Sequence, residues 1–309
     1  MGSAMRYLLS LMVFASLWSC EPHIEFSHAV KDFERGEKSE LIVEDRPRFL
    51  TWSAMITSVK KSACIDHQRA TVDPETIALR ARLKRTLSTL VLDRLVTPAA
   101  GLAFWINTYN IAVFEAATDA ATSRPNVSLS DEGFALYRRP ILDVGGHLLA
   151  PDWILHGIIR GDVEHISLSG ISDDDLTFVL NQHRALGEFD DPRIHFALAC
   201  GAVSCPPLPE APMDGTQLDA QLDAAVRAFI SDSERGAGPR GISAIFRWYP
   251  DDFSVVGGIA QFLANHEVGR EVKTGESLPW NWQLETFVPT NPRCAIPEPN
   301  EPPVGTDPT

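Results

Sequence analysis

The sequence predicts an α+β fold, a single domain in which a small, mostly antiparallel sheet packs with helices. Apolar residues recur at helical spacing in several segments, and shorter apolar runs of strand length lie between them. A Gly-Gly pair separates two of these runs, which is typical of a hairpin turn. The chain has 309 residues, 44% of them hydrophobic, and shows no internal repeat or interior linker, so one domain is the simplest organisation.

The N-terminal residues resemble a secretion signal. Arg6 precedes a short apolar stretch, residues 7–18, that falls short of the roughly 20 residues a membrane-spanning helix needs. Leu17 and Ser19 before Cys20 resemble the bacterial lipobox, in which the cysteine is acylated and becomes the new N-terminus. We therefore expect a signal peptide over residues 1–19 and a protein exported to the periplasmic side of the cell envelope, anchored to a membrane through Cys20. The alternative is an ordinary signal peptide that is cut elsewhere.

The segments on either side of the predicted domain have a different composition. Residues 20–48 are rich in charge without a clear period, which indicates a tether and lead-in. Residues 291–309 are rich in proline, which indicates a disordered tail. The globular domain is accordingly expected over residues 49–290.

Charge and motif content exclude several classes of partner. The net charge of −14 and pI near 5.0 repel phosphate backbones, so no nucleic-acid partner is expected. No Gly-rich phosphate loop, Gly-x-Ser-x-Gly elbow or His-Glu-x-x-His motif occurs, and no cofactor is expected. Metal binding is disfavoured because the one close pair of cysteines has no second close pair beside it.

Capping residues mark the start of several helices. Asp73 followed by Pro74 predicts a helix that continues to about residue 95. Ser and Thr followed three residues later by Asp resemble capping boxes and predict helices over 172–183 and 216–230. Shorter helices are expected over 151–160 and 256–266.

A buried helix with two polar residues is predicted over residues 101–121. Apolar side chains cover nearly its whole circumference, which is the pattern of a helix buried on all sides. Asn107 and Asn110, three positions apart, share one face. Because a buried amide must have its hydrogen bonds met, the two either brace neighbouring backbone or line a polar pocket.

A hairpin and two strands are predicted near the candidate histidines and cysteines. Residues 141–150 form a predicted hairpin around Gly145-Gly146, and 242–249 a further strand before a turn at 250–252. Residues 194–200 read as an apolar strand that ends at Cys200, and Cys205 follows a Gly-containing turn. Strand alternation places His195 opposite Cys200, so His195 is not its direct base. His156, on a capped helix, is then the better candidate.

The two thiols of Cys200 and Cys205 admit three interpretations. One of them is a nucleophile activated by a histidine, the two form a structural disulfide, or both are buried and inert. The pairing of Cys64, Cys200, Cys205 and Cys294 cannot be chosen from the sequence, although an exported protein permits disulfides.

Four motifs stand out along the chain. They are AFWINTYN (103–110), VGG with DWILHGIIR (144–146 and 152–160), DPRIHFAL with Cys200 and SCPPL (191–198 and 204–208), and IFRWY with Asp252-Phe253 (245–249). Together they resemble the family called DUF547, a domain of unknown function found in bacterial exported proteins and in plants. The resemblance covers roughly residues 90–265. Leu155 stands where the family often has an acidic residue before the histidine.

The resemblance brings no reaction, but it singles out six polar residues: Asn107, Asn110, His156, His195, Cys200 and Cys205. By analogy, these types suggest the Cys–His–Asn chemistry, and the fold, of papain- and transglutaminase-like enzymes.

The leading hypothesis is an enzyme that hydrolyses or transfers the acyl group of an amide or thioester. Cys200 or Cys205 would be the nucleophile, His156 the base, and Asn107 or Asn110 an orienting or oxyanion group. The alternative is a non-enzymatic envelope lipoprotein that binds a partner or ligand, with Cys200–Cys205 as a structural disulfide. Thiol–disulfide exchange is a third class, distinguished by a readily reducible bond.

Overall fold

The computed structural model describes most of the chain beyond residue 48. The described residues are 42–43, 46–47, 49–62, 64–92, 97–124, 126–165, 168, 170–187, 190–266, 271–288 and 294. All of these residues belong to one compact unit of the chain. The predicted signal peptide, Cys20 and nearly all of the predicted tether and tail lie outside them. Within the described part, no helix combines the length and hydropathy needed to cross a membrane.

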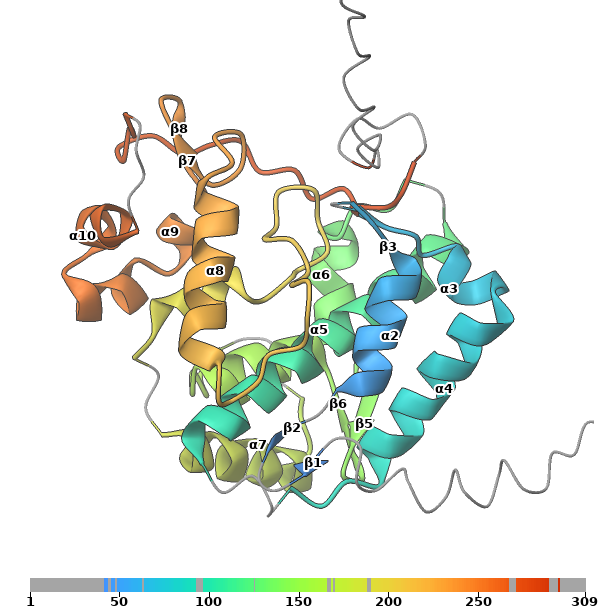
Figure 1. Ribbon diagram of the computed structural model, residues 1–309. Helices are drawn as coiled ribbons and strands as arrows, with labels where there is room; N and C mark the ends of the chain where they lie inside the picture. Colours follow the sequence, from blue (N-terminus) through green and yellow to red (C-terminus); the bar gives the residue numbers. More distant parts are fainter. Residues whose placement is uncertain are drawn as a thin grey trace, which may run out of the picture. The chain divides into compact units, whose positions relative to one another are not determined.

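The described residues form many helices and a few very short strands (Figure 1). The α-helices are α2 (Leu50–Val59), α3 (Arg69–Val72), α4 (Pro74–Ser88), α5 (Pro98–Ser123), α6 (Asp131–Arg138), α7 (Asp173–Leu186), α8 (Leu218–Ile230), α9 (Ile245–Trp248) and α10 (Ile259–Asn265). A π-helix, η3 (Trp153–Ile159), and two 3₁₀ helices, η5 (Pro192–Phe196) and η6 (Pro250–Val256), lie between them.

The strands pair only as local antiparallel ladders. The pairs are β1 (Ile42–Val43) with β2 (Arg46–Pro47), β3 (Lys60–Lys61) with β4 (Cys64–Ile65), β5 (Leu142–Val144) with β6 (His147–Leu149), and β7 (Ala237–Gly238) with β8 (Gly241–Ile242). The predicted α+β class is confirmed. Among the described residues, however, the antiparallel structure is four separate two-stranded ladders, and not one sheet.

Helix α5 is the central element of the main core. Thr97 caps it by accepting a hydrogen bond from the backbone N–H of Ala100 at 3.2 Å, and Pro98 fills its first turn. Nearly every residue from Ala100 to Thr118 is buried, as predicted for a helix that is apolar all round. The helix packs against α3, α6, α7 and η3 (Figure 1).

A second core contains five phenylalanines, packed with smaller apolar side chains. Its rings lie with centroids 4.9–6.3 Å apart, within the range of favourable aromatic contacts. They come from η5, α8, α9, η6 and α10, so this core joins the 3₁₀ helix that carries His195 to the C-terminal helices. The residues are Phe196, Phe229, Phe246, Phe253 and Phe262.

The capping and hairpin predictions are mostly confirmed. The Asp73 carboxylate accepts from the Thr76 N–H at 2.9 Å at the start of α4, and Ser172 caps α7. The β5–β6 hairpin pairs Leu142 with Leu149 across the predicted Gly-Gly turn. The predicted capping box at the start of α8 is wrong, because Thr216 hydrogen-bonds Asp214 and not Asp219.

The two strands predicted beside the site are also wrong. Residues 192–196 form η5, because the Asp191 carboxylate caps its N-terminus and Pro192 supplies the fixed φ of a first helical residue. Of the predicted 242–249 strand, only Ile242 lies in a strand, as the last residue of β8, and α9 follows it. Short apolar runs do not distinguish strand from helix, and here burial against the phenylalanine core favours helix.

Two disulfides join the four cysteines of the described residues. Cys64 pairs with Cys294, 230 residues away, and Cys200 pairs with Cys205. The Cα–Cα distances are 5.2 and 5.5 Å, which is ordinary for a disulfide.

Candidate functional site

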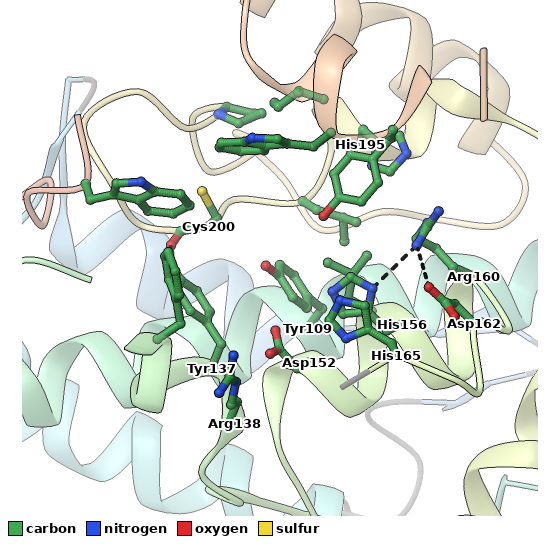
Figure 2. Close-up of a pocket in the computed structure, with 18 of the residues that line it drawn as sticks. Tyr109, Tyr137, Arg138, Asp152, His156, Arg160, Asp162, His165, His195 and Cys200 are labelled. Atoms are coloured by element: carbon green, nitrogen blue, oxygen red, sulfur yellow. Dashed lines mark hydrogen bonds and ion pairs between the residues drawn. The ribbon is translucent and has the colours of Figure 1, made fainter. Parts of the chain in front are cut away.

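A cavity of about 480 Å³ lies among α5, α6, η3, η5 and α9, and Figure 2 shows the residues that line it. This volume is in the range of small-molecule sites. Three residues singled out from the sequence line it, namely His156, His195 and Cys200. Cys205, Asn107 and Asn110 do not.

Three tryptophans form an aromatic wall of the cavity. The indole of Trp248 lies 4.5 Å from that of Trp280 and 5.5 Å from that of Trp282, between ring centroids. Trp282 also contacts the ring of Phe134 at 4.9 Å. Trp248 is 44% exposed, so this wall offers an apolar surface that a ligand can reach.

The segment that carries two of these tryptophans is fastened by the loop of the Cys200–Cys205 disulfide. The N–H of Val203 donates to the carbonyl of Gln283 at 2.9 Å, and the N–H of Glu285 donates to the carbonyl of Gly201 at 2.8 Å. The N–H of Asn281 donates to the Ser204 hydroxyl at 2.9 Å. The disulfide loop therefore helps to hold the aromatic wall in place.

The π-helix η3 brings an acid and a histidine to the cavity. Asp152 immediately precedes the helix and His156 lies four residues on, and both line the cavity. Gly157 allows η3 to lie close to α7, because a Cβ at this position would come within 2.5 Å of Val179. π-helical turns are rare and often occur at functional sites, so the local geometry agrees with a site here.

The Asp152 carboxyl lines the cavity, and its pKa is raised. Burial disfavours its ionised form and raises its pKa to about 6, although Arg138 acts in the opposite direction. The carboxyl makes no hydrogen bond or ion pair with the described part of the chain. Asp152 is therefore a group that changes protonation near neutral pH and faces a ligand-sized space.

His156 is buried and neutral. Burial lowers its pKa to about 2, and the nearby cationic forms of His165 and Arg160 act in the same direction. Its ring stacks on that of His165 with centroids 3.5 Å apart, and Arg160 Nη1 lies 3.5 Å from its Nδ1 (Figure 2). A base with so low a pKa takes up protons poorly at neutral pH, which weakens the hypothesis that His156 is the general base.

His195 belongs to a network of paired groups. Its Nε2 lies 2.7 Å from the Asp252 carboxylate, which also accepts two hydrogen bonds of 3.0 Å from the Arg160 guanidinium. The ring of Tyr249 stacks on His195 at 4.3 Å, and the Arg160 guanidinium lies 4.7 Å from the centre of the same ring. The network connects η3, η5 and η6, and thereby fixes one side of the cavity.

In this oxidised form, Cys200 and Cys205 are joined in a disulfide, the second of the three interpretations of the two thiols. Cys200 is half-buried and lines the cavity, whereas Cys205 is buried and its sulfur accepts from the Ala202 N–H at 3.2 Å. Because the two sulfurs are bonded to each other, neither is a thiolate. The alternation argument about His195 also fails, since η5 is not a strand.

The two asparagines of α5 brace backbone, one of the two roles predicted for them. The Asn107 side chain exchanges hydrogen bonds of 2.9 and 2.8 Å with the carbonyl and N–H of Met213. The Asn110 side chain donates to the Ala197 carbonyl at 3.0 Å and accepts from the Ala199 N–H at 2.8 Å. Asn110 thus holds the segment that leads from His195 to Cys200.

Replacing Asn110 with alanine is expected to lower the free energy of unfolding by about 2 kcal/mol, because it leaves a buried N–H and a buried carbonyl without partners. Denaturant unfolding followed by circular dichroism measures this change. Asn181→Ala, at an exposed position, is the control and should stay within about 0.5 kcal/mol of the parent. Equal effects of the two substitutions would show that the bracing contributes nothing.

Several residues of the cavity were missed from the sequence. Asp152, which lines the cavity, and Asp252, which holds Arg160 and His195 beside it, both stand inside the motifs, but residue type alone favoured the histidines and thiols. Tyr109 also lies in the first motif, between the two asparagines. Trp248 of the aromatic wall lies in the fourth motif, whereas the Trp-x-Trp at 280–282, which supplies the other two indoles, lies in none of the four motifs.

Comparison with known proteins gives one match. The model of a family described as "Protein of unknown function, DUF547" matches residues 94–230. No curated protein and no solved structure matches the chain. The match supports the resemblance seen in the motifs, and it spans α5, η3, η5 and the Cys200–Cys205 loop.

Proposed function

We propose that this DUF547-like domain binds a small organic molecule in the 480 Å³ cavity, with Cys200–Cys205 as a structural disulfide. One observation carries the proposal. The cavity combines an aromatic wall with polar groups, Asp152 among them, that have no partner in the described part of the chain. Ligand sites have this composition, mostly apolar with a few polar groups that fix orientation.

We also propose that the protein is exported and anchored to a membrane of the cell envelope through Cys20, after removal of residues 1–19. The lipobox-like sequence motivates this proposal. The two disulfides support it, because disulfides persist in oxidising compartments outside the cytoplasm.

Binding of N-phenyl-1-naphthylamine, a neutral aromatic dye that fluoresces in apolar sites, tests the cavity. We expect saturable binding to the purified domain and a loss of about tenfold in affinity for Trp282→Ala, which corresponds to about 1.4 kcal/mol of lost aromatic contact. Leu50→Ala removes an exposed apolar side chain outside the cavity and should bind the dye as the parent does. A signal that does not saturate, or one that Trp282→Ala leaves unchanged, would contradict the proposal.

A thiol enzyme is the second candidate, favoured by the position of Cys200 in the same cavity as His156. In this case the reduced form would be active, with the Cys200 thiolate attacking the carbonyl carbon of an amide or thioester.

Labelling with iodoacetamide before and after mild reduction separates the two candidates. If the disulfide is structural, we expect no labelling of Cys200 or Cys205 until strong reductant is added. Ready reduction, followed by faster labelling of Cys200 than of Cys205 and slower labelling in His156→Ala, would favour the thiol enzyme. Labelling that is indifferent to His156 would exclude this histidine as the activating base.

A further inference from the structure

Asp152 differs from the carboxyl groups in and beside the cavity because no hydrogen bond or ion pair from the described residues holds it. Asp252 is bound by Arg160 and His195, and Asp162 lies 3.5 Å from Arg160. Asp152 has neither a hydrogen bond nor an ion pair in the described part of the chain, although it lines the cavity and is largely buried. A buried carboxyl without a structural partner costs stability, which favours a functional reason for its presence.

Two hydrogen-bond donors line the same cavity as this carboxyl. Tyr109 is 3% exposed, lines the cavity and makes no hydrogen bond with the described residues. Its pKa is raised well above the usual value by burial and by neighbours that include Asp152, so the hydroxyl keeps its proton. Figure 2 shows Tyr109, Asp152 and His156 together in the cavity.

The second donor is His156 in a defined tautomer. Arg160 has only N–H donors, and its Nη1 faces His156 Nδ1, so Nδ1 of the neutral ring is the acceptor. The ring proton then resides on Nε2, for which no partner is present in the described part of the chain. The imidazole therefore offers an N–H to a ligand and has no tendency to accept a proton at neutral pH.

We propose that Asp152 is the general base of a hydrolase site for neutral esters or thioesters, with Tyr109 and His156 donating hydrogen bonds to the carbonyl oxygen. This rests on the proposed function, since it requires that the cavity take up a small molecule. Asp152 is the catalytic base in this assignment, and no side chain forms a covalent bond to the substrate.

The reaction needs only water as a second reactant. The Asp152 carboxylate takes a proton from a water molecule while the water oxygen bonds to the substrate carbonyl carbon. The carbonyl oxygen becomes negative and accepts from Tyr109 and His156. When the carbonyl re-forms, the bond to the leaving alkoxide or thiolate breaks and the Asp152 carboxyl returns the proton to it. One ester and one water thus give one acid and one alcohol or thiol, and Asp152 ends as it began.

The other groups of the cavity define the substrate class. Glycoside cleavage ordinarily uses two carboxyl groups across the scissile bond, whereas here only Asp152 is without a partner among the described residues of the cavity. Asp162 repels an anionic substrate, and Arg160 is already bound to Asp162 and Asp252. The charge of Arg138, which also lines the cavity, is offset by the nearby Asp152 carboxylate. The indoles suit an apolar acyl or alcohol group. A neutral substrate with an apolar part and a single carbonyl meets these conditions.

Hydrolysis of p-nitrophenyl butyrate by the purified oxidised domain tests the assignment, with butyrophenone as an analogue that has a carbonyl but no leaving group. We expect kcat/KM to rise with pH through a midpoint near 6, where Asp152 ionises. Asp152→Asn should lose about 100-fold or more in kcat/KM, and Tyr109→Phe about 100-fold. Asp152→Asn should bind butyrophenone within a few-fold of the parent affinity, measured by calorimetry. Tyr109→Phe loses a hydrogen bond to the carbonyl oxygen and should bind it up to about tenfold more weakly, well short of its expected loss in kcat/KM. Activity should withstand iodoacetamide, because no thiol takes part.

The outcomes separate this inference from the proposed function. Butyrophenone binding without hydrolysis, or hydrolysis that Asp152→Asn leaves intact, overturns the role of Asp152 and leaves the ligand cavity standing. Loss of activity to iodoacetamide overturns it in favour of the thiol enzyme. If neither butyrophenone nor the naphthylamine dye binds, the proposed cavity function fails as well.

Discussion

Replacing Asp252 with alanine is expected to lower the free energy of unfolding by about 3–5 kcal/mol at neutral pH. The Asp252 side chain is 12% exposed and that of Arg160 15%, and two 3.0 Å hydrogen bonds join them. Alanine would leave the guanidinium partly buried without its main partner, and would also remove the acceptor of His195. Removing one partner of a buried ion pair costs more than the pair itself contributes, because a charge remains in a medium of low dielectric.

The loss of stability in Asp252→Ala is expected to depend on pH. Burial alone would raise the pKa of Asp252, but hydrogen bonds from His195 and Arg160 outweigh it and lower the pKa to about 2. A carboxyl with a lowered pKa stabilises the folded state above its ordinary pKa near 3.8, and this stability is lost as pH falls toward 2. The difference between parent and variant should therefore be full at pH 7 and shrink below about pH 4.

Chemical unfolding is measured for the parent, Asp252→Ala, Arg160→Ala, Asp251→Ala and the double variant Asp252→Ala with Arg160→Ala. Asp251 is the exposed neighbour, and its variant should change stability by no more than about 0.5 kcal/mol. The double variant should be much less unstable than the sum of its single changes, because it leaves no unpaired charge. Additive losses would show that the two side chains do not act together.

Asp152→Asn is expected to act in the opposite direction and stabilise the domain by up to about 3 kcal/mol at pH 7.5. The pKa of Asp152 is raised by burial from 3.8 to about 6, and each unit is about 1.4 kcal/mol. Between these values the unfolded chain releases this proton while the folded domain keeps it, so the parent loses stability as pH rises from about 4 to 6. Asparagine has no such proton and avoids the loss.

The measurement is the stability difference between variant and parent at several pH values. We expect it to grow between pH 4 and 6 and to stay constant above pH 6. Asp251→Asn is the matched control at an exposed position. A difference that does not vary with pH would mean that Asp152 is not perturbed in the folded domain. Together with the expected loss of hydrolysis, a gain in stability would identify a group kept for activity at the expense of stability.

The sequence predicted those features that depend on local patterns. Helix α5, the Asp73 and Ser172 caps and the β5–β6 hairpin follow from periodicity and from residues at fixed offsets. The strand expected at 194–200 failed because Asp191 and Pro192 start a 3₁₀ helix, a local signal that the apolar run obscured. The pairing of Cys64 with Cys294 could not be predicted, because it depends on contacts between segments 230 residues apart.

The sequence predicted the location of the candidate site better than the protonation of its residues. The motifs led to His156, His195 and Cys200, which all line the cavity. Residue type alone favoured histidine as the base, but protonation depends on burial and on neighbouring charges. Burial lowers the pKa of His156 and raises that of Asp152, and neither shift is visible without the fold.

The hydrogen bonds between the Cys200–Cys205 loop and residues 281–285 join the segment that the family model matches to residues well beyond it. The family match stops at residue 230, whereas Asp252 and all three tryptophans of the cavity come later in the chain. A protein shortened to the matched segment would retain Asp152 and His156 but would lack the opposite wall and the partner of Arg160 and His195. Comparisons between this chain and proteins that the same family model matches therefore need to include the sequence downstream of residue 230, where the three tryptophans that line the cavity lie.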